Sequence, residues 1–460
     1  MSITPLQQAA IAAHRFGLGE ARLDELKADP QAWLAAQIGP ADAPRGEGLL
    51  GTRAALEHVA AEKELRRAAK NAAAGSTAEK LLAGHYREVI QADARSRFIT
   101  AAATRRPFAE RLQLFWTNHF TVSLAKGSAR GLVGAFERDA IRPHIAGSFE
   151  ALLVASTMHP AMLRYLDNVQ SAGPNSRIVA RAARRAARDD ETPRITGLNE
   201  NLAREVLELH TLGVQGGYSQ ADVTAFARVL TGWRVGLQST DPSDSFDANW
   251  HEPGRKTVLG KSYGEGPDAL RQVLHDLARH PSTARFIATK LARHFVADAP
   301  PPALVDRLAA AYQRSDGQLP EVYRELIRSP EAWDLPATKL KMPEEFVLSS
   351  VRVLGADQRV FARGDGAALQ ALGQRVQAAP SPAGWSDRAE DWLGPDAVWK
   401  RVEWATRVAD RLGGSVDARS VAEQSLGPLL GDTTRQQIDR AADGSQALAL
   451  LLMAPEFQRR

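Results

Sequence analysis

Cysteine is absent from this chain of 460 residues, which excludes disulfides, thiolate metal sites and a cysteine nucleophile. No run of about 18 apolar residues occurs, so no membrane-spanning helix is expected. Residues 1–8 lack the basic region followed by an apolar region that marks an export signal. We therefore expect a soluble protein, cytoplasmic as given, or periplasmic or secreted if a signal has been trimmed.

An excess of one charge is also lacking. The formal net charge is only +4, and Lys and Arg are interleaved with Asp and Glu almost everywhere. A pI near 9.3 therefore gives little reason to expect a nucleic-acid partner.

Strand patterns are few and short, whereas Ala, Leu, Arg and Glu recur at helical spacing between Gly or Pro breaks. The sequence thus predicts a mainly α fold. We expect a main helical body over residues 1–334 and a C-terminal helical layer over 335–460, or one continuous domain. The clearest predicted helices are 106–117, 148–158, 199–212, 219–233, 267–279, 282–297, 302–315, 343–354 and 446–453, the fourth opened by a capping box at Ser219 and Asp222.

Two segments have a composition typical of mobile chain. Residues 61–80 are rich in Ala, Lys, Glu and Arg, and residues 171–197 carry five arginines between Gly and Pro. The second segment is either an electrostatic arm for an anionic partner or a solvated helical excursion or loop.

Residues 199–214 carry an unusual number of polar groups on a strongly helical segment. At about 100° per residue, Asn201, Glu205 and Glu208 share an arc at the border of an apolar stripe. Carboxylates at such a border are expected to be half-buried, where they complete a polar network or carry chemistry.

An irregular stretch follows over residues 234–266. Within eight residues it places Trp250, His251, Glu252 and Lys256 close to Gly254, a density that suits a cleft for a polar, anionic or sugar-like ligand. The alternative is a loop fixed by Trp250.

A second stretch, with Trp385, Trp392, Trp399 and Trp404, is expected to pack the C-terminal layer onto the body.

Motifs along nearly the whole chain resemble the bacterial DUF1800 family, a domain of unknown function. They occur in the expected order: His14-Arg-Phe-Gly17, Trp116-Thr-Asn-His-Phe120, Pro160-Ala-Met-Leu163, Tyr165-Leu-Asp-Asn168, Asn199 to Val214, Leu230-Thr-Gly-Trp233, His251 to Thr257, His280 to Ala284 and Ala454 to Gln458.

The resemblance implies a largely helical protein. Family members are often exported and often occur beside a sulfatase-like partner family. The chain departs from the family pattern at His159 and Glu252, where Asp is usual, and at the arginine-rich stretch before Asn199.

We predict a hydrolase-like enzyme acting on a polar substrate, with carbohydrate as the first candidate. Glu205 would transfer the proton, Glu208 would tune it, and His119 and His251 would support it as base or ligands. Substrate-binding candidates are Asn201, Trp250, Lys256, Asp167, Asn168 and Trp233.

Two alternatives stay open. A divalent metal could bind Glu205 or Glu208 with His119 and His251, although no pair has diagnostic spacing. The protein could instead be a non-catalytic binding or assembly partner of a sulfatase-like protein. A two-carboxylate glycosidase would need a second carboxylate from another segment, because Glu205 and Glu208 leave one helix edge; the candidates are Glu137, Asp139, Asp167, Asp222 and Glu252.

Overall fold

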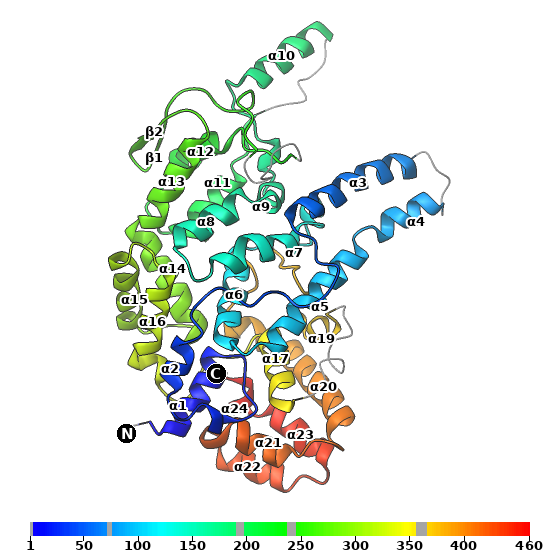
Figure 1. Ribbon diagram of the computed structural model, residues 1–460, viewed down its shortest axis with the longest axis vertical. Coiled ribbons are helices and arrows are strands. Elements are labelled where there is room, and N and C mark those ends of the chain that lie inside the picture. The colour runs from blue at the N-terminus through cyan, green and yellow to red at the C-terminus, as the bar shows by residue number, and fades with distance from the viewer. Residues whose placement is uncertain (1–2, 71–75, 190–196, 237–244, 356–365) are drawn as a thin grey trace.

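A computed structural model describes residues 3–70, 76–189, 197–236, 245–355 and 366–460. These residues form an elongated, mainly helical body from which a two-helix arm and one further helix project (Figure 1). The predicted mainly α fold is confirmed. None of the described helices is both long and apolar enough to cross a membrane.

The first part of the chain contains short helices around three longer ones, α3, α5 and α6. Their bounds are α1 (Pro5–Ile11), η1 (Ala12–Phe16), η2 (Leu23–Glu25), α2 (Pro30–Ala35), α3 (Thr52–Lys70), α4 (Thr77–Gly84), α5 (Arg87–Ala103), α6 (Pro107–His119), η3 (Gly127–Ala129), α7 (Val133–Phe136), η4 (Glu137–Ile141), η5 (Arg142–His144), α8 (Phe149–Met158), α9 (Pro160–Tyr165), η6 (Asn168–Gln170) and α10 (Arg177–Asp189).

The middle and C-terminal parts continue the helical pattern. They comprise α11 (Asn201–Glu205), η7 (Val206–Thr211), α12 (Gln220–Leu230), α13 (Asp268–Arg279), α14 (Pro281–Phe295), α15 (Pro302–Arg314), α16 (Leu319–Arg328), η8 (Pro330–Trp333), α17 (Pro343–Leu354), α19 (Ala367–Ala371), η9 (Ala389–Trp392), α20 (Pro395–Leu412), α21 (Ala418–Ser425), η10 (Gly427–Leu429), α22 (Asp432–Asp439), α23 (Gly444–Met453) and α24 (Pro455–Gln458).

Local capping explains why many helices begin where the sequence predicts. The Ser148 hydroxyl accepts a hydrogen bond from the Ala151 amide at the start of α8. Ser219 and Asp222 form the expected capping box at the start of α12. Proline in the first turn, where no amide donor is needed, starts α6, α14, α15 and α17.

The predicted helix 199–212 is divided into an α-helical and a π-helical part. From Val206 onward, backbone hydrogen bonds join residues five apart instead of four. An example is the hydrogen bond of 2.9 Å from the Leu212 amide to the Leu207 carbonyl. The Thr211 hydroxyl also donates to the Val206 carbonyl at 2.6 Å. Such π turns occur frequently at functional sites. Because this one adds a residue to the turn, it changes which side chains after Glu205 share a helix face with it.

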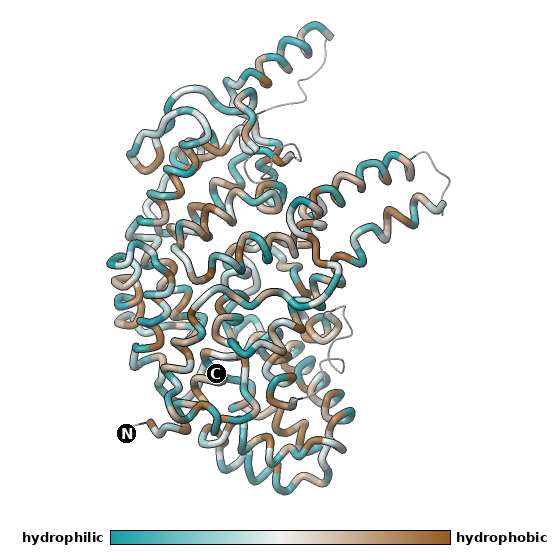
Figure 2. The backbone as a smooth tube through the Cα atoms, in the orientation of Figure 1, coloured by the Kyte–Doolittle hydropathy of each residue, from teal (hydrophilic) through white to brown (hydrophobic). Residues whose placement is uncertain are grey.

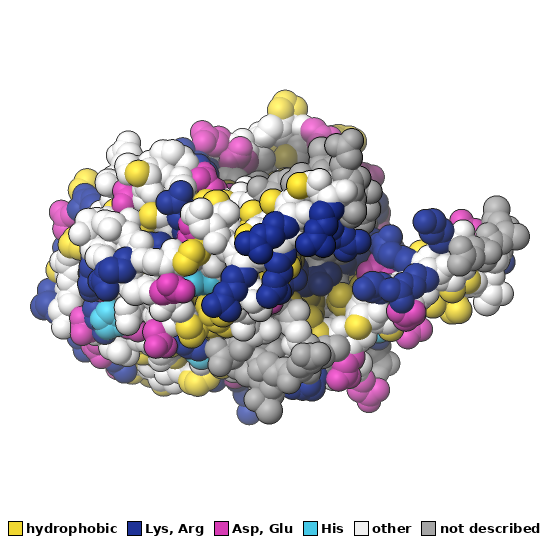
Figure 3. Space-filling view, turned by 90° about the horizontal axis from the view of Figure 1, so that it is seen from above, with side chains coloured by type: hydrophobic (Ala, Val, Ile, Leu, Met, Phe, Trp, Pro, Cys, Tyr) yellow, Lys and Arg dark blue, Asp and Glu magenta, His cyan; other side chains and the backbone are white. Residues whose placement is uncertain are grey.

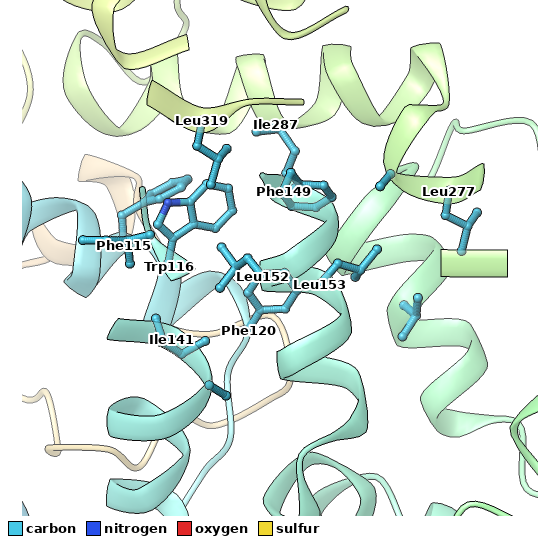
Figure 4. Packing of buried hydrophobic residues seen from close by; sticks show 14 of the residues in the cluster. Phe115, Trp116, Phe120, Ile141, Phe149, Leu152, Leu153, Leu277, Ile287 and Leu319 are labelled. Atoms are coloured by element: carbon cyan, nitrogen blue, oxygen red, sulfur yellow. The ribbon is translucent and has the colours of Figure 1, made fainter. Parts of the chain in front are cut away.

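The main hydrophobic cluster extends from Ile11 to Trp333 and fills the body. Figure 4 shows Trp116 of α6 beside Phe115 and Leu319, with Phe149 and Leu152 nearby. The Trp116 indole donates to the Tyr323 hydroxyl at 2.6 Å, which satisfies its polar atom inside the core. This packing fixes α6, which carries His119 at its end.

A second cluster extends from Phe346 to Phe457 and holds the C-terminal helices together. Its buried members lie within residues 335–460, and the division of the chain into a main body and a C-terminal layer stays a prediction. Trp404 and Trp392 are buried, as the sequence predicts, but Trp399 is 66% exposed. Trp399 therefore contributes little to that packing.

The segment 61–80 contributes to a projecting hairpin of α3 and α4, and its residues 71–75 lie outside the described chain. Figure 2 shows that hydrophilic and hydrophobic residues alternate along this arm. Residues 177–189 form α10, which projects separately (Figure 1), and 190–196 lie outside the described residues. Of the two alternatives for 171–197, a helical projection is thus observed, and whether it binds a partner stays open.

The irregular stretch 234–266 includes a small antiparallel sheet. Strands β1 (Lys256–Val258) and β2 (Lys261–Tyr263) pair in the register Lys256 to Tyr263. Residues 237–244 lie outside the described residues. The hairpin packs against α12 and orients the segment that carries His251 and Lys256.

Candidate functional site

Glu205 and Glu208 are half-buried at the border of their helix, as the sequence predicts. Burial, together with the like charge of Glu208, raises the pKa of Glu205. Glu208 accepts a hydrogen bond from the Tyr218 hydroxyl at 3.2 Å. Asn201 is exposed at the start of α11. The two carboxylates therefore share a partly desolvated edge.

The structure brings His251 and Lys256 into direct contact in the loop beside α12. The His251 Nδ1–H donates to the Thr231 carbonyl at 2.7 Å. Its Nε2 accepts from the Lys256 ammonium at 3.0 Å and from the Gly266 amide at 3.2 Å. Burial lowers the pKa of His251. Both ring nitrogens are thus used within the protein, which leaves no free nitrogen for a ligand.

Three other residues of the predicted site have partners that shape this loop and its surroundings. Glu252 accepts from the amide and the side chain of Asn175 at 2.9 and 2.7 Å. The Arg234 guanidinium lies 3.7 Å from the centre of the Trp250 ring. The Lys126 ammonium pairs with Asp167 at 2.5 Å. These contacts join segments of the body.

Asn168 and Trp233 lie in the interior and contact each other. The Asn168 amide donates to the Leu230 and Trp233 carbonyls at 3.1 and 3.2 Å. Both residues are only 1% exposed. A substrate that stays in solvent could not reach them, so their placement suits a structural link between η6 and the end of α12.

His119 makes its polar contact with η7 rather than with the two carboxylates or His251. Its Nε2 bonds the His210 carbonyl at 3.1 Å, and its Nδ1 has no partner among the described residues. Within the described parts of the chain, no hydrogen bond, ion pair or ring contact joins any two of His119, Glu205 and His251. The three predicted reacting groups therefore have no direct contact with one another among the described residues.

His119 instead borders a cavity of about 200 Å³ between α6, α14, α17 and the segment 374–388. This is several times the volume of about 30 Å³ that one water occupies in the liquid. Aromatic, hydroxyl, amide and charged groups share its walls, among them Phe115, Thr117, Asn118, Lys290, Arg375 and Trp385. The cavity thus combines an apolar surface with a few polar groups, as ligand sites do.

Lys290 is one of the residues of this cavity that the sequence did not identify. It is half-buried on α14 and makes no hydrogen bond or ion pair with any described residue. Its ammonium lies 5.6 Å from the Phe286 ring. Burial lowers the pKa of Lys290 to about 8, against the opposing effect of Asp387. An accessible amine of this kind can bind an anion or accept a proton.

One sequence signal could have pointed to Lys290. It lies four residues from both Phe286 and His294, so all three share one face of the predicted helix 282–297. Arg375 and Asp387 had no such signal, because the chain around them is irregular.

A buried ionic network supports the wall behind Lys290. Glu345 accepts from Arg111 at 2.8 Å and from Arg460 at 2.8 and 3.0 Å. His294 Nδ1 lies 3.3 Å from Asp387. Burial would raise the pKa of Glu345, but Arg111 and Arg460 lower it to about 2.

The pKa of Asp387 is also lowered by neighbouring positive groups despite burial. Burial opposes its ionisation, but His294, Lys339 and Arg460 hold the pKa of Asp387 well below its usual range. His294 Nε2 is buried without a hydrogen-bond partner among the described residues. The network therefore forms a charged framework for the cavity wall, and His294 is part of that wall.

The described residues contain no group of three or more His, Asp or Glu side chains arranged to hold a metal ion. The predicted mixed site of Glu205 or Glu208 with His119 and His251 is not assembled there, in agreement with their separate partners.

Comparison with known proteins identifies one family. Residues 11–459 match the family described as "Protein of unknown function (DUF1800)". No curated protein and no solved structure matches the chain. Because the match covers nearly all of the sequence, the chain belongs to the DUF1800 family.

Proposed function

We propose that this protein is a hydrolase-like enzyme that acts on a polar, negatively charged substrate, with carbohydrate as the first candidate, in the cavity bordered by α6 and α14. The observation that carries the proposal is Lys290, an ammonium that faces the cavity without an ion pair or hydrogen bond among the described residues. A desolvated cation of this kind favours an anionic ligand.

The lowered pKa of Lys290, about 8, suits proton transfer near neutral pH. In the proposed reaction its neutral amine accepts a proton from the water that attacks the substrate. As the scissile bond breaks, the resulting ammonium returns this proton to the departing oxygen. The cations Arg375 and Arg388, both exposed and both bordering the cavity, hold the negative charge of the substrate. Trp385 supplies an aromatic surface for an apolar face of the ligand.

This proposal moves the reacting centre away from the helix that carries Glu205. Glu205 retains a raised pKa, but the cavity is bordered by other residues. The substitutions Lys290→Met and Glu205→Gln therefore separate the two locations. Both remove a charge while keeping a side chain of similar length.

The test is hydrolysis of chromogenic 4-nitrophenyl esters and glycosides, namely the glucuronide, sulfate, phosphate and neutral galactoside. We expect the wild type to hydrolyse an anionic member, with a rate that rises through about pH 8 as Lys290 loses its proton. Lys290→Met should lose roughly 100-fold or more in kcat/KM, and Glu205→Gln should retain activity.

Activity that survives Lys290→Met but is lost in Glu205→Gln would contradict the proposal and return the site to α11. Binding of the anionic compounds without turnover, measured by calorimetry, would overturn the enzymatic part in favour of a binding protein. Lys290→Arg separates charge from proton transfer, because it keeps the cation but cannot lose its proton. It should bind substrate and turn it over poorly.

A further inference from the structure

Helix α10 carries a row of arginines on one side. Arg177, Arg181, Arg184 and Arg188 follow each other at intervals of four, three and four residues. At about 100° per residue they fall within an arc of about 60°, and at 1.5 Å per residue the row extends over roughly 16 Å. All four side chains are exposed. The helix therefore presents a straight line of guanidinium groups.

Among the described residues, these arginines have no partners. None of the four makes a hydrogen bond or ion pair with any described residue. The arm behaves differently, because on α3 Arg66 pairs with Glu62 and Arg67 pairs with Glu64. Arg66 and Arg67 are thus neutralised locally, whereas no described carboxylate pairs with the row on α10.

The base of α10 is fixed to the body. The Ile178 amide donates to the Asn249 carbonyl at 3.0 Å. Just before the helix, Asn175 donates twice to the buried carboxylate of Glu252. The row is thus held on an anchored helix, so that its spacing is set before a ligand arrives, which lowers the entropic cost of binding.

Figure 3 shows a band of Lys and Arg side chains across the end of the molecule that carries α10, continuing along the projecting arm. A hollow at the base of the arm is bordered by Lys63, Arg164 and the ion pair of Arg66 with Glu62, so that two of its cations lack that neutralisation. The complementary ligand is therefore long and anionic rather than small.

We infer that the arginine row of α10 binds an anionic polysaccharide, that is, a chain with carboxylate or sulfate groups on successive sugar rings. Residues three and four apart on a helix have Cβ atoms about 5–6 Å apart, which gives one guanidinium for each regularly repeated anionic group. Guanidinium groups bind carboxylate and sulfate in a bidentate manner.

Other polyanions fit the helix less well. Residues 177–189 include no aromatic side chain on which a nucleic-acid base could stack. The face opposite the arginines carries Val179, Ala182 and Ala186, and it lacks the large apolar residues with which amphipathic helices enter a membrane. The site is separate from the cavity of Lys290 and does not depend on the proposed reaction.

The experiment measures binding of the full chain to polygalacturonate, with neutral dextran of matched length as the reference. The test variant is Arg181→Gln with Arg184→Gln. The control is Arg411→Gln with Arg440→Gln, which removes two exposed charges from α20 and from the end of α22. A second variant, Arg181→Lys with Arg184→Lys, keeps the charge and loses the bidentate geometry.

We expect the wild type and the control to bind polygalacturonate and not dextran, with an affinity that falls as salt rises. The glutamine variant should bind at least tenfold more weakly, and the lysine variant should lie between. Lys290→Met should bind like the wild type, so that failure here and failure of the proposed reaction are distinguishable.

Equal affinity of the glutamine variant and its control would overturn the inference. So would tighter binding of a poly-dT oligonucleotide, or of vesicles with one third phosphatidylserine, than of polygalacturonate at the same salt. Circular dichroism checks that α10 and the body remain folded in each variant.

Discussion

Three histidines, His14, His119 and His210, lie in the interior of the protein. His210 is 1% exposed, and neither ring nitrogen has a hydrogen-bond partner among the described residues. Burial lowers the pKa of His210, and also that of His14, to about 3, and it lowers the pKa of His119 well below 6.5. Each of these histidines therefore resists protonation only as long as the protein is folded.

This produces a defined loss of stability in acid. Between pH 6.5 and about 3, the unfolded chain binds a proton at His210 and the folded chain does not, so the free energy of unfolding falls as pH falls. A group that is protonated only in the unfolded chain changes the free energy of unfolding by roughly 1.4 kcal/mol per pH unit.

His210→Leu removes the titrating group without removing a side-chain hydrogen bond. The variant should match or exceed the wild type at pH 7, and it should lose about 2 kcal/mol less than the wild type between pH 6.5 and 4.5. Urea unfolding at both pH values measures this. An identical pH dependence in the two proteins would show that His210 is not protonated on unfolding.

At the scale of elements, a pair of histidines holds the projecting arm together. His58 of α3 and His85 after α4 stack with ring centres 3.9 Å apart. Each Nε2–H donates to the backbone carbonyl of the other residue, at 2.9 and 2.8 Å. The arm has few buried apolar residues, so this contact is a large part of what joins its two helices.

His58→Ala should therefore open the arm without unfolding the body. Loss of the hydrogen bond and the ring contact should destabilise the closed arm by about 1–2 kcal/mol. Amide exchange in residues 52–70 and 77–84 should therefore become roughly tenfold faster. Hydrogen exchange with mass spectrometry provides the measurement, and Glu64→Ala, which breaks an exposed pair with Arg67, is the control with little expected effect. Faster exchange throughout α6 and α14 would contradict a local role.

Elements were also what the sequence predicted best. The predicted helices 148–158 and 267–279 agree with α8 and α13 within one residue, because a cap or a proline marks their ends. The π turn after Glu205 could not be predicted, since its bonds depend on packing around Val206 to Thr211. Lys290 lies in a predicted helix, but its lack of a partner is a property of the folded cavity.

At the scale of the whole molecule, the cavity wall also joins the two hydrophobic clusters. Arg111 lies on α6 in the main body, whereas Glu345 lies in the first turn of α17 and Arg460 follows α24. The N-terminal helix α1 packs against η10 of the C-terminal part. Removing one member of such a buried ion network costs about 3–5 kcal/mol, because the remaining charges stay desolvated. Partial unfolding of either cluster would expose this network.

We therefore expect the two clusters to unfold together. Leu207→Ala in the main cluster and Leu448→Ala in the C-terminal cluster each remove a fully buried side chain and should cost about 2–5 kcal/mol. Calorimetry should show one transition for the wild type, and both substitutions should shift that same transition downwards. Two transitions, each shifted by only one of the substitutions, would mean that the clusters are independent domains. The ion pairs of Glu345 with Arg111 and Arg460 would then not couple them.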